Sequence, residues 1–269
     1  MSTVRQPAVS GRFYPANPEI LRRDVSSYLS PAKERVTAIG CVTPHAGYMY
    51  SGQVAGAVFS RVAVPVRCIV LCPNHTGQGH PLAIMQEGAW QTPLGDLKLD
   101  SELAHRLMSA FPGLMDDPAA HRAEHAIEVE LPFLQLLRPD ATFVPIALGT
   151  GQLLILEQLG HALANVIGES ADPVLIVASS DMNHYEDDAT TRIKDGKAID
   201  RILALDGRGL YETVINEGIS MCGFGPTVSM LTAARQLGAS RAELVQYATS
   251  GDASGDRDIV VGYAGIIIQ

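Results

Sequence analysis

Residues 66–72 read VRCIVLC, and Pro73 follows them directly. A short apolar run of this kind, rich in branched side chains and bounded by a proline, predicts a β-strand that is buried on both faces. Strands buried on both faces are typical of parallel sheets, in which helices cover the sheet on either side. This stretch therefore favours an α/β fold.

The rest of the chain repeats this pattern of buried strands and helical stretches. Strands are predicted at residues 35–43, 141–148, 173–179, 243–248 and 259–268, and short strands or a hairpin at 81–100. Helices are predicted at residues 18–29, 51–62, 101–110, 124–137, 152–167, 188–205, 207–217 and 226–237. There is no long linker and no clear internal repeat. We therefore expect a single α/β domain over residues 1–269, with a central, mostly parallel sheet covered by helices.

The starts of two helices can be predicted more closely. Asn17 followed by Pro18 is a favourable pair for an N-cap and the first helical position. Ser101 is expected to cap the helix that follows it. The stretch 124–137, EHAIEVELPFLQLL, is predicted to be helical despite Pro132.

Composition excludes several functional classes. The 269 residues are 46% hydrophobic and 18% charged, which excludes a disordered chain. With 20 Lys and Arg against 29 Asp and Glu, the net charge of −9 argues against partners such as nucleic acid or an anionic membrane. The chain has no run of about 18 apolar residues, so no membrane span is expected. The first residues lack the apolar core of a secretory signal, so we expect a cytoplasmic protein.

Three predicted strands each release a histidine just beyond their carboxyl end. His45 lies in PHAGY, His75 in PNHTG and His184 in SDMNHY. In open α/β sheets, ligands bind at the carboxyl ends of the strands, so these side chains are expected to lie at one edge. Imidazole is a common metal ligand and a general base near pH 7. Asp181 is expected either to orient His184 or to cap the following helix.

The four cysteines form no C-x-x-C pair, so a zinc ribbon or a thioredoxin-type motif is excluded. Three of them lie in or beside apolar runs and are expected to be core residues. Cys222 instead lies in MCGFGPT, before a helix predicted to start near Pro226. A thiol at a helix N-terminus has a lowered pKa, so Cys222 could bind a metal or attack an electrophile. The alternative is a buried packing cysteine.

Residues 121–125, HRAEH, fit the H-x-x-E-H pattern of inverted zinc peptidases. On a helix, His121 and His125 would share one face. The preceding residues 116–118, DDP, indicate that a helix begins near or after His121, which weakens this interpretation. No phosphate-binding loop and no dinucleotide fingerprint are present, so nucleotide-dependent chemistry has no support.

Taken together, these motifs resemble those of the Memo family, also called AmmeMemoRadiSam system protein B. The matching segments, in family order, are RQPAVSGRFYPANP, PHAGYMYSG, PNHTG, WQTPLG, EHAIEVELPF, SSDMNHY and MCGFGP. They span nearly the whole chain. The family fold is similar to that of the LigB-type class III extradiol dioxygenases, which are non-heme iron enzymes.

The resemblance implies a site. Its metal ligands would be His45, His75 and Cys222, and its catalytic pair would be Asp181 and His184. The expected cofactor is one divalent metal, iron in the first place, with copper or zinc as alternatives. Because Cys222 replaces the carboxylate ligand of the dioxygenases and thiolate is softer, extradiol ring cleavage does not carry over directly.

Four further residues are expected near this site. His125 and Glu124 would support it from behind the ligands. Tyr48 and Tyr185 are candidates for the pocket wall, and a packing role is the alternative for both.

Three functions remain open at this point. The first is a non-heme, metal-dependent oxidoreductase, dioxygenase-like, acting on an unknown small molecule. The second is a binding or scaffold protein that keeps the fold without the activity. The third is a hydrolase that uses a metal or Cys222. The family name further implies an AMMECR1-like protein and a radical SAM enzyme as pathway partners.

Overall fold

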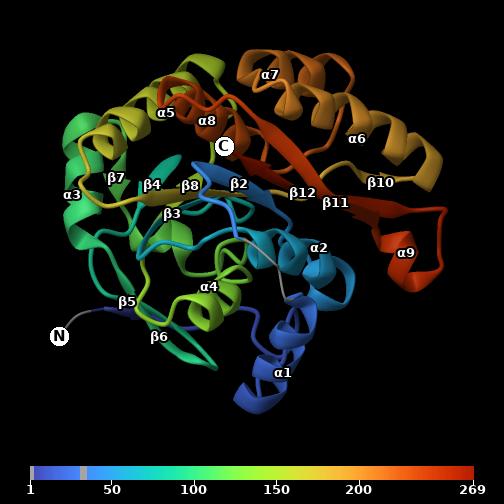
Figure 1. Cartoon of the computed structure of the whole chain (residues 1–269), viewed down its shortest axis with the longest axis horizontal. Coiled ribbons are helices and arrows are strands. Elements are labelled where there is room, and N and C mark those ends of the chain that lie inside the picture. Colours follow the sequence, from blue (N-terminus) through green and yellow to red (C-terminus); the bar gives the residue numbers. More distant parts are fainter. Residues whose placement is uncertain (1–2, 31–34) are drawn as a thin grey trace.

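A computed structural model describes residues 3–30 and 35–269 of the chain. Over these residues, twelve strands form one sheet (Figure 1). Five central strands are parallel and lie in the order β6 (Gly95–Leu99), β8 (Thr142–Leu148), β3 (Arg67–Pro73), β9 (Val174–Ser179) and β2 (Gly40–Thr43). The predicted α/β class with a mostly parallel central sheet is confirmed.

Antiparallel pairing is found toward the edges of the sheet. The remaining strands are β1 (Val4–Arg5), β4 (Leu82–Ile84), β5 (Ala89–Thr92), β7 (Met115–Asp116), β10 (His184–Glu186), β11 (Ala242–Thr249) and β12 (Val260–Ile268). Strand β12 runs antiparallel to β2, β10 and β11, and β5 forms a hairpin with β6. The parallel part of the sheet thus ends at β2, where β12 pairs with it in the antiparallel direction.

Helices cover both faces of the sheet, as the apolar strands require. Along β3, Ile69 and Leu71 belong to one apolar core, whereas Cys68 and Val70 belong to the other, because alternate side chains point to opposite faces. The first core packs under α3 (Ser101–Ala110), α5 (Leu153–Gly168), α6 (Asp188–Leu203), α7 (Gly207–Asn216) and α8 (Phe224–Gln236). The second packs under α1 (Pro18–Tyr28), α2 (Tyr48–Arg61) and α4 (Leu131–Leu137) (Figure 1). Two short helical segments, η1 (Pro118–His121) and α9 (Ser250–Ser254), complete the elements of the described chain.

Some predicted boundaries were wrong. The strand predicted at 35–43 is reduced to β2, with only a single bridge from Val36 to Val62 ahead of it. Ser101 is the first residue of α3, and its cap is Asp100, whose carboxylate accepts the Leu103 N–H. The predicted cap at Asn17 is confirmed, since its side chain accepts two N–H groups of the first turn of α1.

The helix predicted at 124–137 begins only at Leu131. Two contacts explain the late start. The Arg5 guanidinium donates to the Glu124 carbonyl, which a helix would need for its own ladder, at 2.6 Å. The Glu124 carboxylate also accepts the N–H groups of His125 and Ala126. Residues 124–125 are therefore irregular and 126–130 form turns, and the carboxylates of this segment face other elements.

No helix within residues 3–30 and 35–269 is both long enough and apolar enough to cross a membrane.

Candidate metal centre

Three histidine rings converge at one end of the sheet. His45 follows β2, His75 follows β3, and His125 comes from the turns that precede α4. One ring nitrogen from each lies within 4.8 Å of the other two. A group of imidazoles this close is an arrangement that suits a metal ion such as zinc, copper or iron. Because β2 and β3 are parallel, their carboxyl ends bring His45 and His75 to the same edge.

Cys222 lies beside this group. Its Sγ is 3.4 Å from His45 Nε2 and accepts the Asp181 N–H at 3.3 Å. Gly223 lets this loop press against the end of β9, because a Cβ there would lie only 2.4 Å from the Ser179 carbonyl oxygen. Burial and the Asp181 charge raise the pKa of the Cys222 thiol, so the lowering expected from the helix N-terminus is outweighed.

Glu124 orients two of the histidines. Its Oε1 lies 2.9 Å from Nδ1 of His75 and 3.3 Å from Nδ1 of His125, and its Oε2 accepts the His75 N–H at 2.6 Å. Burial raises the pKa of Glu124, but the hydrogen bond and charge of His75 outweigh it, and the net pKa is lowered. In return, Glu124 outweighs burial at His75 and raises that pKa. The bond through Nδ1 leaves Nε2 of His75 available to a metal.

The surroundings of His45 favour the neutral form of its ring. Burial, together with the neighbouring His125 and His75, holds its pKa well below the usual range. Its Nδ1 lies 2.9 Å from the Ser179 hydroxyl, and its main-chain N–H donates to Asp181 at 2.8 Å. A neutral imidazole is the form that binds metals.

Comparison with known proteins decides the family. A sequence model described as "Memo-like protein" matches residues 5–267. The chain belongs to the Memo family. A MEMO1 family protein of Methanopyrus kandleri is 42% identical over 98% of this chain and 99% of its own length. Similar proteins of Methanosarcina mazei and Archaeoglobus fulgidus are each 42% identical, cover 99% of this chain, and are matched over 99% and 100% of their own lengths.

In this Memo-family chain, Asp181 and His184 do not hydrogen-bond to each other. Asp181 accepts from His45, and burial raises its pKa to about 7. His184 Nδ1 lies 2.9 Å from the Ser220 carbonyl oxygen, and the His184 N–H donates to the Ser220 hydroxyl. The helix that follows is capped by Asp187. Asp181 therefore neither orients His184 nor caps the following helix. It holds the backbone of His45 in place by accepting its N–H.

The two tyrosines differ in their surroundings. Tyr48 is buried, and its hydroxyl donates to the Val129 carbonyl at 2.8 Å, which favours packing. Tyr185 is 76% exposed and has a φ of 64°, in the left-handed region that is rare for a bulky residue. Tyr185 thus projects into solvent beside His184 on a strained backbone.

The H-x-x-E-H pattern does not form a peptidase site. His121 ends the short 3₁₀ helix η1 and lies against Trp90, with ring centroids 5.6 Å apart. It is absent from the group that His125 joins. Burial is the main cause that lowers the pKa of His121 to about 4, so it is a neutral core residue.

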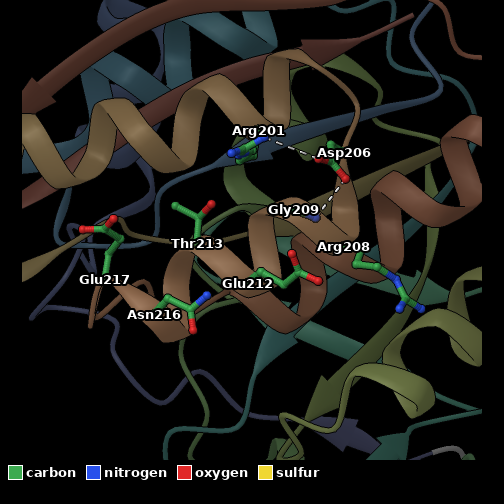
Figure 2. Close-up of a pocket in the computed structure, with 8 residues that line it drawn as sticks. All are labelled: Arg201, Asp206, Arg208, Gly209, Glu212, Thr213, Asn216 and Glu217. Carbon is green, nitrogen blue, oxygen red and sulfur yellow. Dashed lines mark hydrogen bonds and ion pairs between the residues drawn. The ribbon is translucent and has the colours of Figure 1, made fainter.

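Two hollows differ in chemistry. One of about 320 Å³ is lined by His75 and Cys222 together with uncharged residues such as Asn74, Thr150 and Phe224. Another of about 440 Å³ lies at α7 (Figure 2). There Asp206 pairs with Arg201 at 3.7 Å and caps the helix through the Gly209 N–H. Arg208 and Glu217 of this hollow likewise form ion pairs, with Glu157 and Lys197, and no cluster of metal-binding side chains lies among its described lining residues. The hollow beside the histidines is therefore the candidate site.

Sequence reasoning missed two polar residues behind the site, Ser179 and Glu130. Both are fully buried, and the Ser179 hydroxyl lies 3.1 Å from Glu130 Oε1. A signal was present for Glu130: residues 124–130 hold three glutamates among apolar residues and one histidine, and buried carboxylates need partners. A single serine at a strand end gives no such signal.

Proposed function

We propose that this Memo-family protein binds one divalent metal ion and is a metal-dependent oxidoreductase acting on a small molecule. His45 and His75 would be ligands, with Cys222 as the anionic donor and His125 as a further nitrogen. The observation that carries the proposal is the convergence of three ring nitrogens within 4.8 Å, with the Cys222 thiol 3.4 Å from one of them.

The donor set fits such an ion. Ser179 and Glu124 occupy Nδ1 of His45 and of His75, so each ring presents Nε2. Imidazole suits iron, copper and zinc, and a thiolate shifts the preference toward the softer ions. We propose iron first, with copper or zinc as alternatives. A redox-active ion would supply electron transfer and polarise a bound substrate oxygen.

The chain's own residues would supply the remaining functions. His184 would hold or release a proton at Nε2, because its Nδ1 faces the Ser220 carbonyl and so carries the other proton. Phe224 and Thr150 would bind the substrate in the uncharged hollow. We further propose, from the family name alone, that an AMMECR1-like protein and a radical SAM enzyme act in the same pathway.

Metal analysis tests the proposal. Protein purified without oxygen or chelator is expected to carry about one metal ion per chain by inductively coupled plasma mass spectrometry. His45→Ala and Cys222→Ser should lose it. His105→Ala is the matched control, because His105 is an exposed residue of α3 whose Nδ1 lies 2.6 Å from the Ser101 carbonyl oxygen. Metal-free protein, or equal metal in all variants, would overturn the proposal and favour a binding or scaffold protein.

A second candidate is a cysteine hydrolase, favoured by the distance of 3.4 Å between Cys222 Sγ and His45 Nε2. The thiolate is the form that attacks an electrophile and also the form that binds a metal. The raised pKa of the thiol therefore disfavours a hydrolase that works without a metal, whereas a bound ion would itself displace the thiol proton. Alkylation of Cys222 by iodoacetamide distinguishes the two. A ligand reacts slowly and is protected by added metal, whereas a hydrolytic nucleophile reacts rapidly and gives a burst with activated esters.

A further inference from the structure

Behind the histidine cluster, the Ser179 hydroxyl is the centre of a small buried network. Its Oγ lies 2.9 Å from His45 Nδ1, 2.8 Å from the Ala126 carbonyl oxygen and 3.1 Å from Glu130 Oε1. Ser179, Glu130 and His45 are all buried, so water does not compete for these bonds. Thr43 donates to the same Glu130 oxygen at 2.9 Å.

Proton counting fixes the direction of these bonds. A serine hydroxyl has one proton to donate and two lone pairs that accept. The Ala126 carbonyl can only accept, and leaving it without a donor in a buried place is unfavourable. The Ser179 proton therefore goes to the Ala126 carbonyl or, where Glu130 is ionised, to Glu130 Oε1, and neither case leaves a proton for His45. His45 Nδ1 must then donate its own proton to Ser179, whichever protonation state Glu130 has.

We infer that Ser179 is a positioning residue that holds His45 in the tautomer with its proton on Nδ1. Nε2 is then left with a lone pair, and this is the atom that lies 3.4 Å from Cys222 Sγ. The inference rests on the proposed function in one respect, namely that Nε2 is the atom offered to a metal. Ser179 touches neither substrate nor metal and acts through His45.

The tautomer can be measured without any metal. In ¹⁵N-labelled, metal-free protein, a long-range ¹H–¹⁵N correlation spectrum distinguishes the two nitrogens of each ring. Comparison with His45→Ala assigns the His45 signals. The expected result is a protonated Nδ1 and an unprotonated Nε2 in the wild type. A proton on Nε2 in the wild type would overturn the inference even if every Ser179 variant failed to fold.

Variants then test the role of the hydroxyl. Ser179→Ala is expected to shift His45 toward the Nε2-protonated form, and Ser179→Thr should restore the original form. Ser229→Ala is the matched control, because Ser229 is equally buried and donates to the Leu156 carbonyl at 2.9 Å, away from the histidines. An unchanged His45 tautomer in Ser179→Ala would overturn the inference.

Zinc affinity, measured by chelator competition, separates this inference from the proposed function. Loss of a group that orients a metal-binding histidine typically weakens metal binding about 10–100-fold. We expect a loss of this size in Ser179→Ala and none in Ser229→Ala. Equal affinity in the two variants would contradict the positioning role. A wild type that binds no zinc, iron or copper would refute the proposed function, and the tautomer spectra would still decide the inference.

Discussion

Glu124 and Glu128 lie four residues apart and are both completely buried, yet they have different partners. Glu128 faces Arg5, a permanent cation, and it also accepts from the N–H groups of Ala8 and Val9. Glu124 faces His75 and His125, whose charge depends on protonation or metal. The comparison teaches that a buried carboxylate with a fixed cation holds the fold, whereas one that faces histidines prepares a site.

The largest effect is expected at the fixed pair. Glu128→Gln leaves the Arg5 guanidinium, which is 4% exposed, without a charge partner. Breaking one side of a buried ion pair typically costs about 3–5 kcal/mol, so the free energy of unfolding should fall by that amount. Urea unfolding of metal-free protein measures it. Metal stoichiometry of the folded protein should not change.

A surface pair is the matched control for this measurement. Arg61 and Glu243 form a bidentate ion pair but are partly exposed. Glu243→Gln should cost no more than about 1 kcal/mol, as is usual for exposed pairs. If Glu128→Gln and Glu243→Gln lower the free energy of unfolding equally, the ion pair of Glu128 does not hold the fold in the way proposed.

The next effect concerns the pH dependence of stability. Burial is the main cause that raises the pKa of Glu130 from 4.5 to about 8. The folded protein then binds this proton more tightly than the unfolded chain, so stability is lost as pH rises between 4.5 and 8. Compared with Glu130→Gln, the free energy of unfolding of the wild type should fall by on the order of a few kcal/mol over this pH window. Above pH 8 it should fall no further relative to the variant. Urea unfolding of both metal-free proteins at several pH values measures this. A difference in free energy of unfolding between them that does not change with pH would contradict the prediction.

A smaller effect is expected at Glu124. Glu124→Gln keeps the shape of the side chain and an acceptor oxygen but removes the charge that faces His75 and His125. Metal affinity should fall about 10–100-fold, as for other groups that orient metal ligands. Stability without metal should fall less than in Glu128→Gln. A loss of stability without any loss of zinc affinity would assign Glu124 to the fold rather than to the site.

The smallest effect is expected at Tyr185, which lies next to His184 in the chain and is compared with the buried Leu205. Tyr185 adopts a left-handed φ of 64° but packs little, since it is 76% exposed. Tyr185→Gly should therefore stabilise the protein by about 1 kcal/mol, because glycine adopts this conformation without a Cβ clash. Leu205, with a φ of 56°, is buried, and Leu205→Gly should destabilise. Thermal unfolding compares the two, and a destabilised Tyr185→Gly would show that the strain is compensated by packing.

The parts of the structure that depend on local pattern could be predicted from the sequence. The buried strands were predictable from their apolar runs, and so was the meeting of His45 and His75 at one edge. The break at 124–130 could not be predicted, because its cause is Arg5, 119 residues away along the chain. The arrangement of Ser179 behind His45 likewise depends on contacts across 134 residues. Local patterns predict elements, whereas long-range hydrogen bonds decide where those elements stop.

The pairing of β12 with β2 has a consequence for biosynthesis. Ile266, Ile267 and Ile268 pair with residues 40–42, which end three positions before His45. Every proposed metal ligand has been synthesised once Cys222 has left the ribosome, yet β2 still lacks its neighbour on one side at that stage. Since a domain generally folds as a unit, and β2 is completed only by its pairing with β12, metal loading should follow translation of β12. A ribosome stalled between Cys222 and β12 would therefore display all the ligands of the centre on a chain that is not yet able to hold the ion.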